Sequence, residues 1–292
     1  MAGRPLEVPR TPAQLRRLTS RWAGAGEAVG LVPTMGSLHR GHLSLVQAAR
    51  AACERVVVSI FVNPLQFGQE QDYLSYPRQL DSDLAQLARL KVDAGYCPSV
   101  EDIYPSGFAT RVEVDTGEPL WEARWRPGHF VGVATVVTKL FSATGPCRAF
   151  FGEKDAQQAV LVARLAEDLD LGVEVVVRPT VRDPDGVALS SRNQLLSAGG
   201  RRAARCLPRA LLAAGLGFTG GTGGGGELAD LAAEVIRSEP LAQLDYAGVV
   251  DPASFSSVQR ASAETRVLVA ATVEGVHLID TALLGAPPQF SD

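Results

Sequence analysis

Two histidines separated by two residues offer the strongest chemical signal in this chain. The segment from Leu31 to His42 reads Leu-Val-Pro-Thr-Met-Gly-Ser-Leu-His-Arg-Gly-His, an apolar strand, a Pro/Gly turn and the start of a helix. On a first helical turn His39 and His42 share one face, and Gly41 leaves the backbone open to a large ligand. The helix N-terminus adds N–H groups and partial positive charge. The pattern predicts a nucleoside triphosphate site, with both imidazoles directed at the phosphates.

A zinc site is the other chemistry that paired histidines suggest. It needs a third ligand, and no Cys or Glu completes an H-E-x-x-H pattern here. The chain has only 4 histidines, so a pair directly after a strand and turn favours a functional role over a structural one.

Two further segments follow apolar runs of strand length and carry polar groups suited to ligands. In Asn63-Pro-Leu-Gln66, two neutral amides can meet hydroxyl and carboxylate groups, although a plain polar loop reads the same way. In Phe150-Phe-Gly-Glu-Lys-Asp-Ala-Gln-Gln158, Lys154 is a cation of the kind that meets phosphates. Asp155 is expected to cap the following helix or to help hold a metal.

Two loops complete the candidates. Ser190, Ser191 and Arg192 offer two hydroxyls and a guanidinium that can wrap a triphosphate, or a serine pair that caps a helix. Asp81 and Asp83 open a predicted helix, where acidic residues are favoured on electrostatic grounds alone.

Composition limits the class of protein. The 292 residues suit one large or two moderate domains, and 46% hydrophobic content indicates a full core. A net charge of −4 argues against a nucleic-acid-coating surface. No apolar run reaches membrane-spanning length, and the first residues lack the apolar core of a signal peptide. Four scattered cysteines without C-x-x-C are typical of reduced thiols in a cytoplasmic protein.

The elements that must position these residues alternate between strand and helix in the first part of the chain. Strands are expected at 28–34, 56–62, 93–97, 148–152 and 173–177, with helices at 42–53, 81–91, 129–142 and 155–169. This alternation predicts an α/β fold with a doubly wound parallel sheet. No G-x-G-x-x-G opens its first helix, so a nicotinamide dinucleotide is not the expected ligand.

The pattern changes after about residue 185, which predicts domains at 1–185 and 186–292. We expect one helix over 197–216, a flexible glycine-rich loop over 217–226 and a helix over 227–238. Strands near 244–250, 265–272 and 276–282 complete a smaller α+β domain.

Five motifs in order resemble the pantothenate synthetase (pantoate–β-alanine ligase) family. They are Pro-Thr-Met-Gly-x-Leu-His-x-Gly-His, Ser-Ile-Phe-Val-Asn-Pro-x-Gln-Phe, Tyr-Pro-Arg, Phe-Phe-Gly-Glu-Lys-Asp-x-Gln-Gln and Ser-Ser-Arg-Asn. The family belongs to the nucleotidyltransferase superfamily, whose HIGH and KMSKS signatures match His39–His42 and Leu189–Arg192. The resemblance implies that pantoate attacks the ATP α-phosphate, giving pantoyl adenylate and pyrophosphate. β-Alanine then gives pantothenate and AMP.

The resemblance also implies roles for individual residues. ATP contacts fall to Met35, Gly36, Ser37, Leu38, His39, Arg40, Gly41, His42, Gly152, Glu153, Lys154, Asp155, Val181, Leu189, Ser190, Ser191 and Arg192. Of these, the catalytic set is His42 as proton donor, with His39, Lys154, Ser190, Ser191 and Arg192. Gln66 and Gln158 hold pantoate, Gln66 also meets β-alanine, and Asn63 and His129 lie nearby. Mg²⁺ bridges the phosphates, with Asp83 as its candidate protein ligand, and the family suggests a homodimer.

Two departures from the family pattern are visible. Ser82 stands where relatives can carry an acid, which leaves Asp83 as the metal candidate, with Asp81 as an acid that can compensate. Ala156 replaces an aromatic residue usual after Lys-Asp, which predicts looser packing or altered substrate fit.

Three other functions compete with the ligase. A pantetheine-phosphate adenylyltransferase would call for Lys or Arg where Gln66 and Gln158 stand. A non-catalytic nucleotide-binding regulator should have lost His42 or Lys154. A tRNA-binding role conflicts with the acidic composition.

Overall fold

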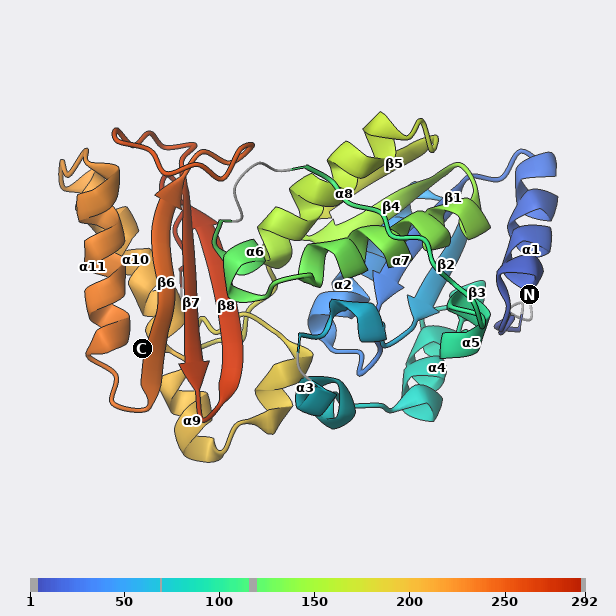
Figure 1. Ribbon diagram of the computed structural model, residues 1–292, viewed down its shortest axis with the longest axis horizontal. Coiled ribbons are helices and arrows are strands. Elements are labelled where there is room, and N and C mark those ends of the chain that lie inside the picture. The colour runs from blue at the N-terminus through green and yellow to red at the C-terminus, as the bar shows by residue number, and fades with distance from the viewer. Residues whose placement is uncertain (1–4, 69, 116–119, 290–292) are drawn as a thin grey trace. The chain divides into compact units, whose positions relative to one another are not determined.

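Near-continuous apolar runs form a five-stranded parallel sheet in the order β3-β2-β1-β4-β5 (Figure 1). The structure is a computed structural model that describes residues 5–68, 70–115 and 120–289. The strands are β1 Val29–Thr34, β2 Arg55–Ile60, β3 Ala94–Tyr96, β4 Cys147–Gly152 and β5 Val173–Arg178. The α/β, doubly wound architecture expected from the sequence is confirmed.

The chain divides into two compact units. The N-terminal unit comprises Met1–Gly117, Arg126–Gly152 and Gln158–Arg178, and the C-terminal unit comprises Glu118–Trp125, Glu153–Gln157 and Pro179–Asp292. The main boundary between the two compact units thus lies at Arg178, and the short segments Glu118–Trp125 and Glu153–Gln157 also belong to the C-terminal unit. The functional division at residue 185 stays a prediction. Within the described ranges, no helix is both long and apolar enough to cross a membrane.

Helices cover both faces of the parallel sheet. The helices around this sheet are α1 Pro12–Gly24, α2 Arg40–Ala52, α3 Glu70–Ser75, α4 Leu80–Arg89, α5 Val100–Ile103, α7 His129–Thr144 and α8 Ala156–Asp168. Successive strand side chains point to opposite faces: Leu31 packs with α1 and α7, whereas Val32 packs with α2 and α4.

The order of the strands defines where a ligand is expected. β1 pairs with β2 on one side and with β4 on the other, and all of these pairs are parallel. The winding of the sheet therefore reverses between β1 and β4, and open α/β sheets bind ligands at the carboxyl ends of such strands. The two strands end at Thr34 and Gly152, directly before the histidine motif and the Glu-Lys-Asp motif.

The C-terminal unit contains an antiparallel sheet in the order β6-β7-β8. Its elements include α6 Glu122–Trp125, the 3₁₀ turns η2 Glu153–Asp155 and η3 Ser191–Leu195, α9 Ala198–Ala203, α10 Cys206–Thr219, α11 Gly225–Arg237, β6 Ala242–Val250, β7 Arg266–Val273 and β8 Val276–Leu283. The buried faces of α10 and α11 share a core with β7.

Two expectations for this unit were wrong. The helix expected over 197–216 is broken between α9 and α10, because Pro208 lacks an N–H and its ring would clash with the carbonyl of Ala204 in a continuous helix. The glycine-rich loop is only 220–224, since α10 extends to Thr219 and α11 begins at Gly225. The loop was expected to be flexible, but main-chain hydrogen bonds fix its end: Gly225 N–H donates to Gln259 O, and Ala261 N–H donates to Gly223 O.

A histidine held by two carboxylates attaches α6 to this antiparallel sheet. His277 on β8 lies 2.7 Å from Asp245 and 2.9 Å from Glu122. Asp245 sits at a β-bulge in β6 and also accepts from Thr272 Oγ1, and Tyr246 O–H donates to Glu122. Burial alone lowers the pKa of His277, but its bonds to the two acids outweigh burial and raise the pKa above 6.5.

This cluster predicts a pH-dependent contribution to stability. Because the folded pKa of His277 is raised, the contribution is complete below pH 6.5 and is lost as pH rises through that raised pKa. Replacing His277 with Gln removes the charge but leaves a polar side chain beneath the stacked Trp125 ring. The gap in melting temperature between the wild type and His277→Gln should be widest near about pH 6 and shrink toward about pH 9. A gap that stays constant over this range would contradict the assignment of the charge to His277.

Candidate active site

The turn between β1 and α2 is held in a backbone conformation that few sequences adopt. Gly36 and Ser37 both have positive φ, of 82° and 51°, in the left-handed region that costs most residues free energy. A Cβ on Gly36 would also lie 3.0 Å from Asp83 Oδ2. Thr34 Oγ1 stabilises the turn from inside, since it accepts from Gly36 N–H at 3.1 Å and donates to Ser59 O at 2.6 Å.

Asp83 completes the support of this turn from the start of α4. Its two carboxylate oxygens accept from Ser37 N–H and Leu38 N–H, each at 2.8 Å, and the residue is 1% exposed. Burial raises the pKa of Asp83, and the two main-chain hydrogen bonds oppose that shift. Asp83 thus positions the backbone that leads into the histidines.

The two histidines form the N-terminal cap of α2. His39 is the N-cap residue and its Nδ1 accepts from Gly41 N–H at 3.1 Å, while His42 Nδ1 accepts from His39 N–H at 3.4 Å. The rings are tilted by 31° with centroids 4.0 Å apart. A main-chain N–H can only donate, so both rings must be neutral with the proton on Nε2. The pairing expected from the spacing is therefore present, through a reciprocal cap.

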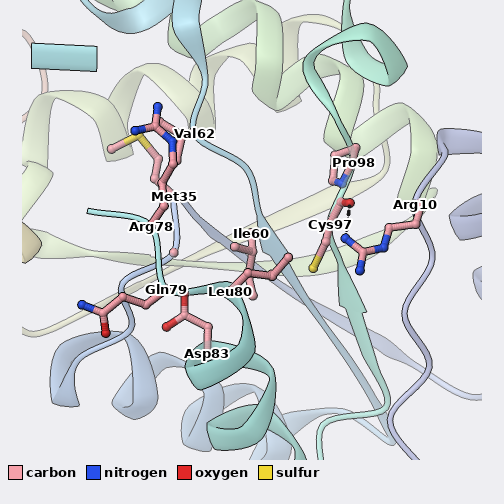
Figure 2. A pocket seen from close by; sticks show the side chains of 11 residues that line it. Arg10, Met35, Ile60, Val62, Arg78, Gln79, Leu80, Asp83, Cys97 and Pro98 are labelled. Atoms are coloured by element: carbon pink, nitrogen blue, oxygen red, sulfur yellow. Dashed lines mark hydrogen bonds between the residues drawn. The ribbon is translucent and has the colours of Figure 1, made fainter. Parts of the chain in front are cut away.

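A cavity of about 170 Å³ opens beside this turn (Figure 2). Met35 and Gly36 line it together with residues of β2 and α4 and with the side chains of Arg10 and Arg78. Arg10 donates to Cys97 O at 3.3 Å, as the dashed line shows. Pockets that enclose drug-sized ligands measure about 300–1,000 Å³, so this cavity suits a small molecule rather than a whole nucleotide.

The amide and imidazole candidates lie together beyond β2. Asn63 N-caps the 3₁₀ turn η1 Pro64–Gln66, and Asn63, Gln66 and His129 are all buried. His129 Nδ1 contacts Gln66 O at 2.9 Å, and Arg126 also donates to that carbonyl, at 3.1 Å. Gln66 Nε2 donates to Met35 Sδ at 3.0 Å, which links this group to the turn after β1.

The candidates of the C-terminal unit fall into two short segments. In η2, Lys154 Nζ lies 3.5 Å from Asp155 and Glu153 accepts from Arg266 at 2.8 Å. Asp155 was expected to cap the following helix, and it stands at the end of this 3₁₀ turn, directly before the first residue of α8. The half-buried Gln158, of the N-terminal unit, lies in the first turn of α8.

The second segment is a hairpin. Leu189 N–H donates to Val181 O at 3.0 Å, which brings together two sets of residues that the resemblance assigns to ATP. Ser190 Oγ accepts from Arg192 N–H and caps η3, and Ser191 is buried. Arg201 contacts Asp183 and Asp185 and anchors the base of the hairpin.

The residues at the two departures lie in ordinary surroundings. Ser82 and Asp81 are not buried on α4, in contrast to Asp83. Ala156 is buried in a cluster with Val250, Phe255 and Leu268. The effect of this departure on packing or on substrate fit stays a prediction.

Mg²⁺ is the metal ion that the resemblance implies, with Asp83 as its candidate protein ligand. Both oxygens of Asp83 accept main-chain hydrogen bonds, so its observed contacts serve the turn, and its role as a metal ligand stays a prediction. Among the residues that the structure describes, no group of three His, Cys, Asp or Glu side chains could hold a metal ion. The protein therefore does not supply a ligand cage of its own within these residues.

Two residues that contact the candidate site were not expected from the sequence. Tyr104 O–H donates to Asn63 Oδ1 at 2.8 Å. The two residues are 41 positions apart in the sequence, so no local pattern could indicate that they meet. Arg126 did leave a signal, because it stands three residues before His129 at the start of a predicted helix. Both side chains can donate to one carbonyl oxygen, which has two lone pairs.

Comparisons with known proteins point to one family. Residues 7–283 match the model of the family described as pantoate-beta-alanine ligase. A pantothenate synthetase of Rubrobacter xylanophilus is 49% identical over 288 residues, covering 96% of this chain and 99% of that protein. One of Cereibacter sphaeroides is 50% identical over 274 residues, with coverages of 94% and 98%.

Solved structures agree with the sequence comparisons. The crystal structure of pantothenate synthetase from Thermus thermophilus superposes with a TM-score of 0.90 at 46% identity, covering 96% of this chain and 99% of that one. The pantoate-beta-alanine ligase of Francisella tularensis, solved in complex with β-γ ATP and β-alanine, gives a TM-score of 0.81 at 33% identity. It covers 97% of this chain and 100% of its own.

The geometry at Asp83 predicts a stability defect. Replacing Asp83 with Asn leaves a buried N–H without an acceptor, which should lower the free energy of unfolding by about 1–3 kcal/mol. Asp81→Asn makes the same change at a less buried position of the same helix and should alter stability by less than about 0.5 kcal/mol. Chemical denaturation of the three proteins measures both values.

Added Mg²⁺ distinguishes a role of Asp83 in positioning the turn from a role in binding the metal. If Asp83 held the ion, added Mg²⁺ would raise the melting temperature of the wild type more than that of Asp83→Asn. The positioning role predicts equal shifts in the two proteins.

Proposed function

The chain belongs to the pantoate–β-alanine ligase family, and from that membership we propose that it condenses pantoate with β-alanine at the expense of ATP. The products are pantothenate, AMP and pyrophosphate. The observation that carries the proposal is the histidine-capped start of α2 at the reversal point of the sheet, with Gln66 linked to the same turn through Met35.

The reaction has two steps, formation of an acyl adenylate and transfer of the acyl group to an amine. An oxygen of the pantoate carboxylate attacks the α-phosphorus of ATP, and the bond to pyrophosphate breaks to leave pantoyl adenylate. The amine of β-alanine then attacks the acyl carbon and loses a proton, and AMP departs with the attacking oxygen of pantoate. Phosphoryl transfer of this kind depends on positioning and on neutralising charge.

The histidine cap suits the first step. Since each Nδ1 accepts a main-chain N–H, the proton of each neutral ring is on Nε2. His39 and His42 therefore offer N–H donors, in addition to the N-terminus of α2, to phosphate oxygens that gain charge. Because the cap fixes both rings beforehand, little reorganisation is needed during the reaction.

The other contacts follow the family pattern. Lys154 and Arg192 supply mobile positive charge for the triphosphate, and Ser190, Ser191 and the Val181 backbone bind the nucleotide. Gln66 and Gln158 bind pantoate. Mg²⁺ bound with ATP would neutralise phosphate charge, and phosphate oxygens and water are the ligands that this ion usually takes. We further propose that the protein works in the cytoplasm as a homodimer.

The direct test is product formation. Purified protein is incubated with ATP, Mg²⁺ and D-pantoate, with and without β-alanine, and pyrophosphate, AMP and pantothenate are measured. AMP and pantothenate should appear together and only when both acids are present. Absence of pantothenate in the complete mixture would refute the proposed function.

Variants of the cap separate catalysis from folding. His42→Asn retains an oxygen that can accept the His39 N–H but loses Nε2, and His42→Ala loses both. Both should lower kcat by about 10²–10³-fold, because each removes a donor that acts on developing charge. Lys154→Ala should cause a loss of similar size.

The cap also predicts different stabilities for the two variants. His42→Asn should melt closer to the wild type than His42→Ala does, since loss of a cap costs about 0.5–2 kcal/mol. Wild-type kcat in His42→Asn would show that the histidine serves only as a cap.

A further inference from the structure

The side-chain amide of Gln66 is held in one orientation by a chain of hydrogen bonds that begins at Tyr104. Gln66 carries one amide oxygen and one NH₂ group, and a free amide can exchange them by rotating. Which of the two faces a substrate decides whether Gln66 recognises an acceptor or a donor.

Asn63 is the middle member of this chain, and its own orientation is determined by main-chain groups. Its Nδ2 lies 3.0 Å from Gly132 O, which can only accept, and its Oδ1 lies 3.3 Å from Leu65 N–H, which can only donate. The assignment of oxygen and nitrogen in Asn63 is therefore unambiguous.

The remaining bonds of Asn63 follow from that orientation. Its second Nδ2 hydrogen donates to Gln66 Oε1 at 3.1 Å, and its Oδ1 also accepts from Tyr104 O–H at 2.8 Å. All four hydrogen-bonding positions of the buried amide are thus occupied. Burial raises the pKa of Tyr104, so its hydroxyl keeps the proton that it donates.

The backbone of Gln66 is held as firmly as its side chain. Gln66 O accepts from His129 Nδ1 and from Arg126. The helix that carries His129 approaches closely because position 132 is glycine, where a Cβ would clash with Leu65 O. Main-chain and side-chain contacts therefore both restrict Gln66.

Only the NH₂ group of Gln66 faces a weak partner. Its Oε1 accepts from Asn63, whereas Nε2 donates to the thioether sulfur of Met35, a poor acceptor that a ligand oxygen can replace. Both Met35 and Gly36 line the neighbouring cavity.

We propose that Tyr104 is a positioning residue which, through Asn63, makes Gln66 a fixed hydrogen-bond donor to a substrate oxygen. This inference rests on the proposed function, since it takes the oxygen to belong to pantoate or to the carboxylate of β-alanine. Because Oε1 is turned toward Asn63 while Nε2 is turned toward Met35, Gln66 favours an acceptor group of the substrate at this position.

The test compares two tyrosines that differ in one respect. Tyr104→Phe removes the hydroxyl but keeps the ring that packs near Phe61 and Phe108. Tyr96→Phe makes the same change at a buried tyrosine whose hydroxyl has no hydrogen-bond partner in the described structure. Pantothenate formation by the wild type is measured first, and its absence would refute the proposed function rather than this inference.

The expected result is a selective change in substrate affinity. Tyr104→Phe should raise the KM for pantoate about 3- to 10-fold, the worth of one hydrogen bond, and leave the KM for ATP unchanged. Tyr96→Phe should leave both KM values unchanged. An unchanged KM for pantoate in Tyr104→Phe, or equal increases in both KM values, would overturn the inference.

A double variant tests whether Tyr104 acts through Gln66. In a Gln66→Met background, Tyr104→Phe should have no further effect on the KM for pantoate, because the oriented amide is already gone. A multiplicative loss in the double variant would show that Tyr104 acts by another route. If Gln66→Met has no measurable turnover, the comparison of Tyr104→Phe with Tyr96→Phe decides the question.

Discussion

The two hydrogen bonds from Ser37 and Leu38 to the buried carboxylate of Asp83 are the constraint on which the candidate site depends. They hold a turn with two consecutive residues at positive φ, one of which is not glycine. Strain of this kind persists only where surrounding groups determine the backbone. The turn leads directly into the N-terminal cap of α2. The positions of His39 and His42 therefore depend on the carboxylate of Asp83, which holds the main chain just before them.

A common principle joins the two parts of the site described for the N-terminal unit. At the histidines, main-chain N–H groups decide which ring nitrogen carries the proton. At Gln66, main-chain groups decide the orientation of Asn63 and, through it, which end of the amide faces outward. In both places the protein presents N–H donors fixed before a ligand arrives. Preorganised donors of this kind suit oxyanions, and both the phosphates of ATP and the acids of the proposed reaction are oxyanions.

The sequence predicted the sheet well because buried parallel strands are nearly continuous apolar runs, as the three consecutive valines of β2 illustrate. It predicted the histidine pair because its spacing is local. It missed the break between α9 and α10, where composition suggested a single helix. The resemblance offered Asp83 as a metal ligand, and its bonds to Ser37 and Leu38 could not be predicted because they join residues far apart in the sequence. Tyr104 could not be predicted, since its link to Asn63 exists only after distant segments pack.

The central claim is that pantoate is activated by bonding its carboxylate to the α-phosphate of ATP. The most direct measurement uses D-pantoate labelled with ¹⁸O in the carboxylate, followed by mass spectrometry of AMP, pyrophosphate and pantothenate. The account predicts one labelled oxygen in AMP and the other in pantothenate, with none in pyrophosphate. Unlabelled AMP alongside labelled pyrophosphate or phosphate would contradict it, because activation would then occur at a different phosphorus atom.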